Sequence, residues 1–201
     1  IEGSITALVT PMNEKGDLDY NSLEKLINFQ IDSGISGLVA VGTTGESATI
    51  DFEDHIKLIE FFIKISNGRV HIIAGTGANS TEEALHLTRE AKNLGADAAL
   101  LVSPYYNKPP QEGIYRHHAK IADEVDIPQI LYNVPSRTAS FIEPETVKRL
   151  SSHQNIIGIK DATGDMKNLS EVLKLCEENI KSKNFFLYSG DDFSFLEFLK
   201  K

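Results

Sequence analysis

Lys160 ends a short apolar segment, Ile156–Lys160, and is followed by Asp161. Its side chain could supply a nucleophile. If the segment is a β-strand, alternation places Ile156, Gly158 and Lys160 on one face. In a closed barrel this face points inward, where burial can lower the pKa of a lysine from about 10.4 by several units. A neutral amine can attack a ketone carbonyl and form a Schiff base. A solvent-exposed strand end is the competing interpretation, because lysines are rarely buried.

Tyr132 and Arg137 follow the preceding apolar run and could serve the same chemistry. Tyr132 has the parity of Ile130, so its hydroxyl would reach the space above Lys160 if the two strands are adjacent. A phenol with a pKa near about 10 can pass protons to and from imine intermediates. Arg137 stands in a proline-stiffened loop, and a guanidinium binds a carboxylate through two hydrogen bonds. Taken singly, a packing tyrosine and a surface arginine are the commoner interpretations.

Two further segments place polar groups after expected strands. Gly42-Thr-Thr-Gly-Glu46 combines two hydroxyls with exposed backbone N–H groups, which suits a carboxylate or a proton relay. A helix-capping loop is the alternative interpretation of this segment. Ser103-Pro-Tyr-Tyr106 places two tyrosines at a loop tip, and aromatic residues with polar ends are frequent in protein interfaces.

Along the chain, short apolar runs alternate with longer amphipathic stretches, and the polar segments follow the apolar runs. Strands are expected at Ile5–Val9, Gly37–Val41, Val70–Ala74, Ala98–Val102, Gln129–Tyr132, Ile156–Lys160 and Phe185–Ser189. Apolar strands separated by helices indicate a parallel sheet, either open and doubly wound or closed into a barrel. The dinucleotide motif of the open fold is missing, since Gly75–Ser80 carries serine at the third glycine position. We therefore expect one α/β domain over residues 1–201 with the (β/α)₈ TIM barrel fold.

The expected barrel is incomplete. The pattern stops after strand 7 and part of helix 7, whereas a TIM barrel needs eight strands and about 250 residues. We expect a C-terminally truncated barrel with two unpaired sheet edges. An isolated chain of 201 residues is expected to aggregate or to be inactive.

Composition narrows the function classes. A net charge of −9 argues against nucleic acid or an anionic membrane as the main partner, and no apolar run is long enough to span a bilayer. The single cysteine, Cys176, excludes a disulfide within the chain and fits a reducing cytosol. No histidine spacing suits a metal, because His117 and His118 are adjacent and cannot share a helix face.

The five polar segments together resemble the dihydrodipicolinate synthase family, within the N-acetylneuraminate lyase superfamily. They occur in the order of the family and cover the whole chain: Gly42–Glu46, Ser103–Tyr106, Tyr132–Thr138, Gly158–Asp161 and Ser189–Asp192. The resemblance implies a lyase that condenses pyruvate with L-aspartate-4-semialdehyde to 4-hydroxy-tetrahydrodipicolinate, on the route to diaminopimelate and lysine. The alternatives are another pyruvate-dependent lyase of sialic or keto-sugar acids, and a non-catalytic barrel that binds a small acid. The loop with Arg137 favours the synthases.

The resemblance also implies roles for individual residues. Lys160 would form the imine with pyruvate, and the proton relay would consist of Tyr132, Thr43 and Tyr106, the last from a neighbouring subunit. Thr44 would hold the carboxylate of pyruvate and Arg137 that of the semialdehyde. No cofactor or metal is expected, because the protonated imine is itself the electron sink. A cytoplasmic homotetramer, assembled as a dimer of dimers, is the expected form.

Some members of the family bind lysine as a feedback inhibitor at the dimer interface. The positions that match this site are Ser47, His55, Asn79, Glu83 and Tyr105. Phe52 stands where some inhibited relatives carry a second histidine. Inhibition by lysine is therefore an open expectation.

Overall fold

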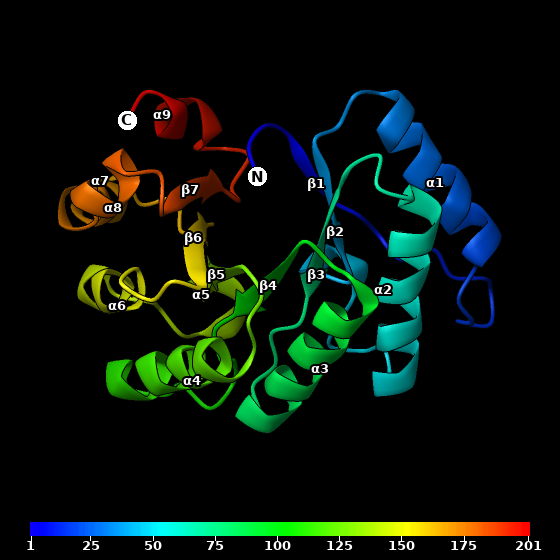
Figure 1. Cartoon of the computed structure of the whole chain (residues 1–201), viewed down its shortest axis with the longest axis horizontal. Helices are drawn as coiled ribbons and strands as arrows, with labels where there is room; N and C mark the ends of the chain where they lie inside the picture. The colour runs from blue at the N-terminus through cyan, green and yellow to red at the C-terminus, as the bar shows by residue number, and fades with distance from the viewer. The chain divides into compact units, whose positions relative to one another are not determined.

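The computed structural model describes residues 1–201, with seven β-strands separated by helices (Figure 1). The strands are β1 (Ile5–Ala7), β2 (Gly37–Ala40), β3 (His71–Gly75), β4 (Ala98–Val102), β5 (Gln129–Asn133), β6 (Ile156–Asp161) and β7 (Phe186–Ser189). The main helices are α1 (Tyr20–Asp32), α2 (Phe52–Ser66), α3 (Thr81–Leu94), α4 (Gln111–Glu124), α6 (Pro144–Leu150) and α7 (Met166–Leu175). Shorter turns of helix are η1 (Thr43–Gly45), α5 (Pro135–Thr138), α8 (Glu177–Lys181) and α9 (Phe195–Leu199). All seven predicted strands are confirmed.

The chain divides into two compact units. The first comprises Ile1–Thr76 with Leu87–Leu100, and the second comprises Gly77–His86 with Leu101–Lys201. Helix α3 and strand β4 therefore each contribute residues to both units.

The first unit is a parallel sheet covered by two helices. Strands β1, β2 and β3 and the start of β4 pair in sequence order. Helices α1 and α2 lie side by side against this sheet (Figure 1), and the residues they bury include Leu23, Ile27, Leu58 and Phe62. Each such side chain contributes about 1.5–3 kcal/mol by leaving water. Both helices begin at an aspartate whose carboxylate accepts a backbone N–H group, Asp19 in α1 and Asp51 in α2.

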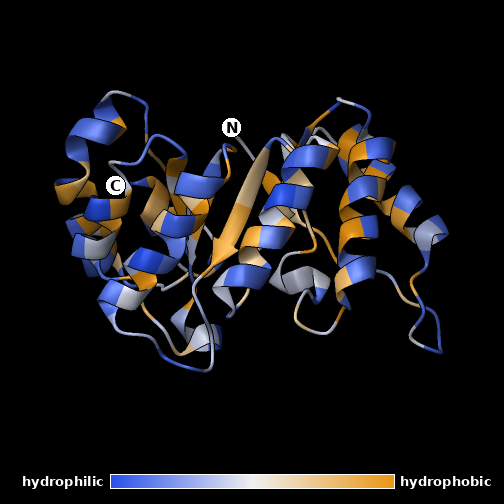
Figure 2. Ribbon diagram, turned by 60° about the horizontal axis from the view of Figure 1, so that its bottom comes forward, coloured by the Kyte–Doolittle hydropathy of each residue, from blue (hydrophilic) through white to orange (hydrophobic).

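The second unit repeats this arrangement. Strands β5, β6 and β7 pair in parallel, again in sequence order. Their outward residues, among them Leu131 and Ile159, pack in a cluster with helices α4, α6 and α7. Apolar residues accordingly lie on the strands and on the helix faces that point to them (orange in Figure 2). Polar residues lie on the outer faces of the helices (blue in Figure 2). Pro144 occupies the first turn of α6 with Glu143 as its N-cap.

A bulge at the start of β6 overturns one expectation. Gln129 of β5 pairs with Ile156, but the next residue, Ile130, pairs with Gly158. Ile157 therefore has no partner in β5 and is the extra residue of the bulge. Because of this shift, Ile156 packs in the same helix-facing cluster as Ile159 instead of sharing a face with Gly158 and Lys160. The prediction for Ile156 was wrong, whereas the shared parity of Gly158 and Lys160 is unaffected.

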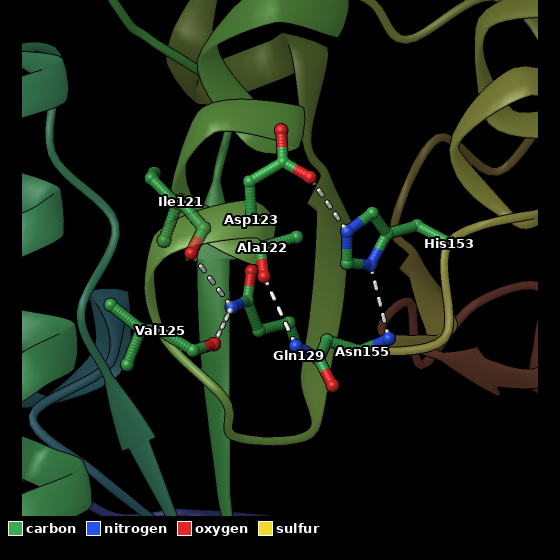
Figure 3. Close-up of polar contacts among 7 residues, drawn as sticks. All are labelled: Ile121, Ala122, Asp123, Val125, Gln129, His153 and Asn155. Atoms are coloured by element: carbon green, nitrogen blue, oxygen red, sulfur yellow. Dashed lines mark hydrogen bonds and ion pairs between the residues drawn. The ribbon is translucent and has the colours of Figure 1, made fainter.

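Side-chain amides fix the starts of β5 and β6 to the end of α4 (Figure 3). The Gln129 amide donates to the carbonyl groups of Ile121 and Val125 at 3.3 and 3.2 Å. The Asn155 amide donates to Ala122 at 3.0 Å, and the Asn155 carbonyl accepts the backbone N–H of Gln129 at 2.7 Å. The bonds to Ala122 and Val125 reach carbonyl groups at the helix end, where intrahelical partners run out, and the Ile121 carbonyl accepts the Gln129 amide in addition to the Val125 backbone N–H. They hold the two strands whose far ends carry Tyr132 and Lys160.

Parallel strands in sequence order, each followed by helix, are the repeat of a TIM barrel, and seven of its eight repeats are present. This is the predicted fold class, and it places the polar segments after strands at their carboxyl ends, where barrel enzymes build their sites. None of the helices combines the length and apolar character needed to cross a membrane.

Candidate active site

Lys160 stands between two tyrosines at the carboxyl end of β6. The strand register pairs it with Tyr132 of β5 on one side and with Tyr188 of β7 on the other. The Lys160 Nζ atom lies 4.5 Å from the centre of the Tyr132 ring, and the Tyr132 side chain is buried. The structure therefore brings together the amine and the phenol that strand parity predicted to be neighbours.

Two glycines make room for the lysine. A Cβ atom at Gly190, just after β7, would lie 2.6 Å from Lys160 Cε and 3.0 Å from Lys160 Cγ. A Cβ atom at Gly158 would lie 2.5 Å from the Phe186 carbonyl oxygen and 3.0 Å from Tyr188 Cε2. Such distances exclude any side chain at either position without movement of the backbone or of Lys160. The Lys160 stem is thus held between its own strand and the Gly190 backbone.

Burial is the main influence on the charge of Lys160. It lowers the pKa of the amine below the usual 10.5, and the Asp192 carboxylate opposes this with a smaller, raising effect. The Tyr132 ring face, 4.5 Å from Nζ, also favours the ammonium and acts in the same direction as Asp192. Since Lys160 is only half-buried, a substrate carbonyl can still approach it.

Asp161 fixes the end of β6 through hydrogen bonds of its side chain and backbone. Its buried carboxylate accepts the Thr163 backbone N–H at 2.8 Å, the Thr163 hydroxyl at 2.7 Å and the Asn168 amide at 3.1 Å. Its backbone carbonyl accepts the N–H of Gly190 at 2.7 Å. Sequence reasoning assigned no role to Asp161, Tyr188 or Gly190. The parity of Tyr188 in the seventh strand and the glycine after it were the available signals.

Arg137 is exposed on the short helix α5, which follows β5. Buried hydrogen bonds hold this loop: the Asn133 side chain exchanges two bonds of 3.1 Å with the backbone of Ile142, and the Thr138 hydroxyl donates to the Ser140 carbonyl at 2.7 Å. The guanidinium therefore extends from a rigid base into solvent, on the same unit as Lys160. Its contact with a substrate carboxylate stays a prediction.

Tyr105 and Tyr106 diverge at the tip of the loop after β4. Tyr106 is 86% exposed and has a left-handed backbone with φ 73°, which is unusual outside glycine. Tyr105 is half-buried, and burial together with the Glu83 carboxylate raises the pKa of its phenol, while a hydrogen bond from the Asn79 backbone lowers it. Tyr105, Glu83 and Asn79 therefore come together, whereas the Tyr106 side chain projects into solvent.

The threonine turn belongs to the first unit. Thr43 and Thr44 are exposed on η1, which is a separate turn because the next helix, α2, has its own cap at Asp51. The helix-capping interpretation of this segment is thus excluded. The Thr10 hydroxyl donates to the Gly45 carbonyl at 2.7 Å and holds the turn against the segment after β1. The approach of the two threonines to Lys160, in the other unit, stays a prediction.

Ser47 and His55, two of the residues expected to bind lysine, also lie in the first unit. His55 is buried, and its Nε2 atom bonds to the Gly75 carbonyl at 2.7 Å. Because a carbonyl only accepts, this nitrogen carries the proton. Burial lowers the pKa of His55, and the bond to Gly75 opposes this more weakly. Within the structure no group of three or more His, Cys, Asp or Glu residues could hold a metal ion.

A parallel β/α barrel with an amine of lowered pKa at a strand end has the arrangement of a Schiff-base lyase or aldolase. Residues 1–201 match the dihydrodipicolinate synthetase family, and the chain belongs to this family. It is 55% identical over 199 residues to the 4-hydroxy-tetrahydrodipicolinate synthase of Alcanivorax borkumensis. The matched residues cover 99% of this chain and 66% of that protein. The chain thus spans about two thirds of the length of such relatives.

Solved structures agree with this assignment. The chloride-inhibited dihydrodipicolinate synthase from Acinetobacter baumannii, complexed with pyruvate, has a TM-score of 0.93 and 50% identity, over 99% of this chain and 67% of that one. The synthase from Cyanidioschyzon merolae with lysine bound has a TM-score of 0.92 and 39% identity, over 98% of this chain and 66% of that one. The predicted fold class and family are confirmed.

Proposed function

We propose that the protein carrying this chain condenses pyruvate with L-aspartate-4-semialdehyde to 4-hydroxy-tetrahydrodipicolinate, in the biosynthesis of diaminopimelate and lysine. The observation that supports this most is the partly buried Lys160 amine, with a lowered pKa, 4.5 Å from the Tyr132 ring centre. Family membership and a relative solved with pyruvate support the choice of substrate.

The reaction begins at Lys160. Its neutral amine attacks the ketone carbon of pyruvate, and loss of water from the carbinolamine gives the imine. A proton then leaves the methyl carbon of pyruvate, the resulting enamine attacks the aldehyde carbon of the second substrate, and the aldehyde oxygen takes up a proton and becomes a hydroxyl. The amino group of the semialdehyde then attacks the imine carbon, which closes the ring and releases the Lys160 amine. Because the protonated imine accepts the electrons, no cofactor or metal is required.

The remaining residues move protons and hold carboxylates. Tyr132, beside the amine, relays protons together with Thr43 and with Tyr106 of a neighbouring subunit. The Thr44 hydroxyl and nearby backbone N–H groups bind the pyruvate carboxylate. Arg137 binds the carboxylate of the semialdehyde through its two-pronged guanidinium.

The assembly we propose is a cytoplasmic homotetramer, a dimer of dimers. The exposed and left-handed Tyr106 supports it, because a large aromatic side chain held away from its own subunit is suited to insertion into another.

A substrate comparison tests the proposed function. A polypeptide that carries this chain at the full length of its relatives is expected to consume pyruvate only when the semialdehyde is present. Borohydride added with pyruvate should leave a reduced pyruvoyl adduct, detected by mass spectrometry. Release of pyruvate from a sialic or keto-sugar acid would instead identify a sugar-acid lyase. Pyruvate binding without an adduct would identify a non-catalytic binder.

We also propose that lysine binds at Ser47, His55, Asn79, Glu83 and Tyr105. The convergence of Asn79, Glu83 and Tyr105 supports this, as does a relative solved with lysine bound. Glu83 would pair with an ammonium of the ligand, and His55 has only its Nδ1 atom left for a contact. Phe52 stands where some inhibited relatives carry a second histidine, so His55 is the one imidazole in the proposed site.

Titration calorimetry with the full-length polypeptide measures this binding directly. Lysine is expected to bind at millimolar concentration or below, and Glu83→Gln should weaken it by about tenfold or more, because charged hydrogen bonds contribute about 1.5–3 kcal/mol. Glu53→Gln, on exposed α2, is the matched control. No heat at millimolar lysine would end the proposal.

A further inference from the structure

The segment Val41–Gly42 enters the threonine turn under backbone strain. Val41 has a left-handed φ of 52° and is fully buried, which is rare for a β-branched residue. Such a conformation persists only where the surrounding structure fixes it. The turn that follows carries Thr43 and Thr44, so whatever holds Val41 also sets the position of both hydroxyls.

Gly75, at the end of β3, is the surface against which this segment rests. A Cβ atom at Gly75 would lie 2.8 Å from the Val41 carbonyl carbon and 2.9 Å from Gly42 Cα. The two backbones are therefore in direct contact, and any movement of Gly75 is passed to the entry of the turn. The Gly42 carbonyl in turn accepts the N–H groups of Gly45 and Ser47, at 3.0 and 3.3 Å, and closes the turn.

His55 holds the carbonyl group of Gly75. Its ring, on helix α2 and 4% exposed, donates from Nε2 to the Gly75 carbonyl at 2.7 Å. A buried hydrogen bond of this length restrains the carbonyl group strongly. Its loss would leave the buried carbonyl without this hydrogen-bond donor, at a cost in free energy. The Thr10 hydroxyl separately holds the Gly45 carbonyl within the turn.

We propose that His55 is a positioning residue for the Thr43–Thr44 turn, acting through the Gly75 backbone and its contact with Val41 and Gly42. This inference rests on the proposed function, in which Thr43 relays protons and Thr44 binds the pyruvate carboxylate. His55 itself touches neither substrate. Loss of its bond is expected to loosen the turn and to misplace both hydroxyls.

Two substitutions of similar size separate the hydrogen bond from the packing. His55→Leu keeps a buried apolar side chain and removes the donor, whereas His55→Gln can present an amide N–H in the place of Nε2. In His55→Leu we expect kcat to fall about tenfold or more, since small misplacements of catalytic groups carry large costs. The KM for pyruvate should rise several-fold, because Thr44 is displaced too, while the KM for the semialdehyde stays unchanged. His55→Gln should recover most of both losses, and Lys57→Gln, exposed on the same helix, is the control.

A purely structural role would lower the amount of active enzyme and leave both KM values unchanged, which would overturn the proposal. Equal behaviour of His55→Leu and His55→Gln would overturn it as well. Hydrogen exchange gives a readout that needs no turnover: the Gly45 and Ser47 amides should exchange faster in His55→Leu, with Leu38–Ala40 unchanged. If the wild-type protein neither turns over nor forms an adduct, the proposed function fails. The exchange experiment then still decides whether His55 positions the turn.

Discussion

Replacing Lys160 with alanine is expected to lower turnover by about three orders of magnitude or more, because the group that forms the covalent bond is lost. Borohydride with pyruvate should then add no mass to the protein, whereas the wild-type protein should carry one adduct on Lys160. The Tyr132 hydroxyl and Arg137 remain in Lys160→Ala, so substrate binding without chemistry is expected. Steady-state kinetics and peptide mapping of the trapped adduct check both results.

The same substitution should leave the fold intact or slightly more stable. Burial disfavours the ammonium, as the lowered pKa of Lys160 reflects, and alanine removes the group that bears this cost. Equal urea midpoints for Lys160→Ala and wild type would therefore attribute the lost turnover to chemistry. Lys167→Ala, exposed in the first turn of α7, is the control and should keep its activity. An adduct that persists in Lys160→Ala would place the nucleophile elsewhere.

Sequence alone predicts the pair at the centre of this site because strand alternation is a local rule. Tyr132 and Lys160 each end an apolar run, and only the adjacency of two consecutive strands had to be assumed. The same rule fails at Ile156. The bulge there depends on the register between β5 and β6, and the residues of neither strand indicate it. Local patterns therefore fix which face a residue shares with its near neighbours, and lose that information across an inserted residue.

Contacts that join distant segments could not be predicted. The approach of Gly190 to the Lys160 stem requires the register of β7, and the bond from His55 to Gly75 requires the orientation of α2 over β3. The turn at Gly42–Glu46 is an intermediate case. Its composition indicated exposed donors, and the structure decided against a helix cap because Asp51 caps α2.

Acid should unfold this protein more readily than its surface charges suggest, because α4 buries two adjacent histidines. His118 is fully buried with both ring nitrogens lacking a hydrogen-bond partner, and His117 bonds only through Nδ1, to the Thr81 hydroxyl at 2.9 Å. Burial lowers the pKa of His117 from 6.5 to about 4, and that of His118 well below its usual value. Both rings are therefore neutral in the folded protein at neutral pH.

The sign of the effect follows from proton linkage. Between pH 6.5 and about 4 the unfolded chain binds a proton at His117 that the folded chain does not, so the free energy of unfolding falls with falling pH. The full stability is present above pH 6.5. At roughly 1.4 kcal/mol per pKa unit, His117 alone accounts for a loss of about 3 kcal/mol by pH 4. His118 and the buried His55, whose pKa is also lowered, add losses of the same sign.

Urea unfolding of the full-length polypeptide between pH 7 and pH 4.5 measures this loss above the range in which most carboxylates titrate. His118→Phe keeps a buried ring without an ionisable group, and His117→Asn keeps a polar atom near Thr81. Each should flatten the dependence of unfolding free energy on pH, and the double substitution should flatten it most. Asn184→Gln, at an exposed position without an ionisable group, is the control and should keep the wild-type slope. A slope that is unaltered in the double variant would mean that carboxylates, and not the α4 histidines, set the acid limit of the fold.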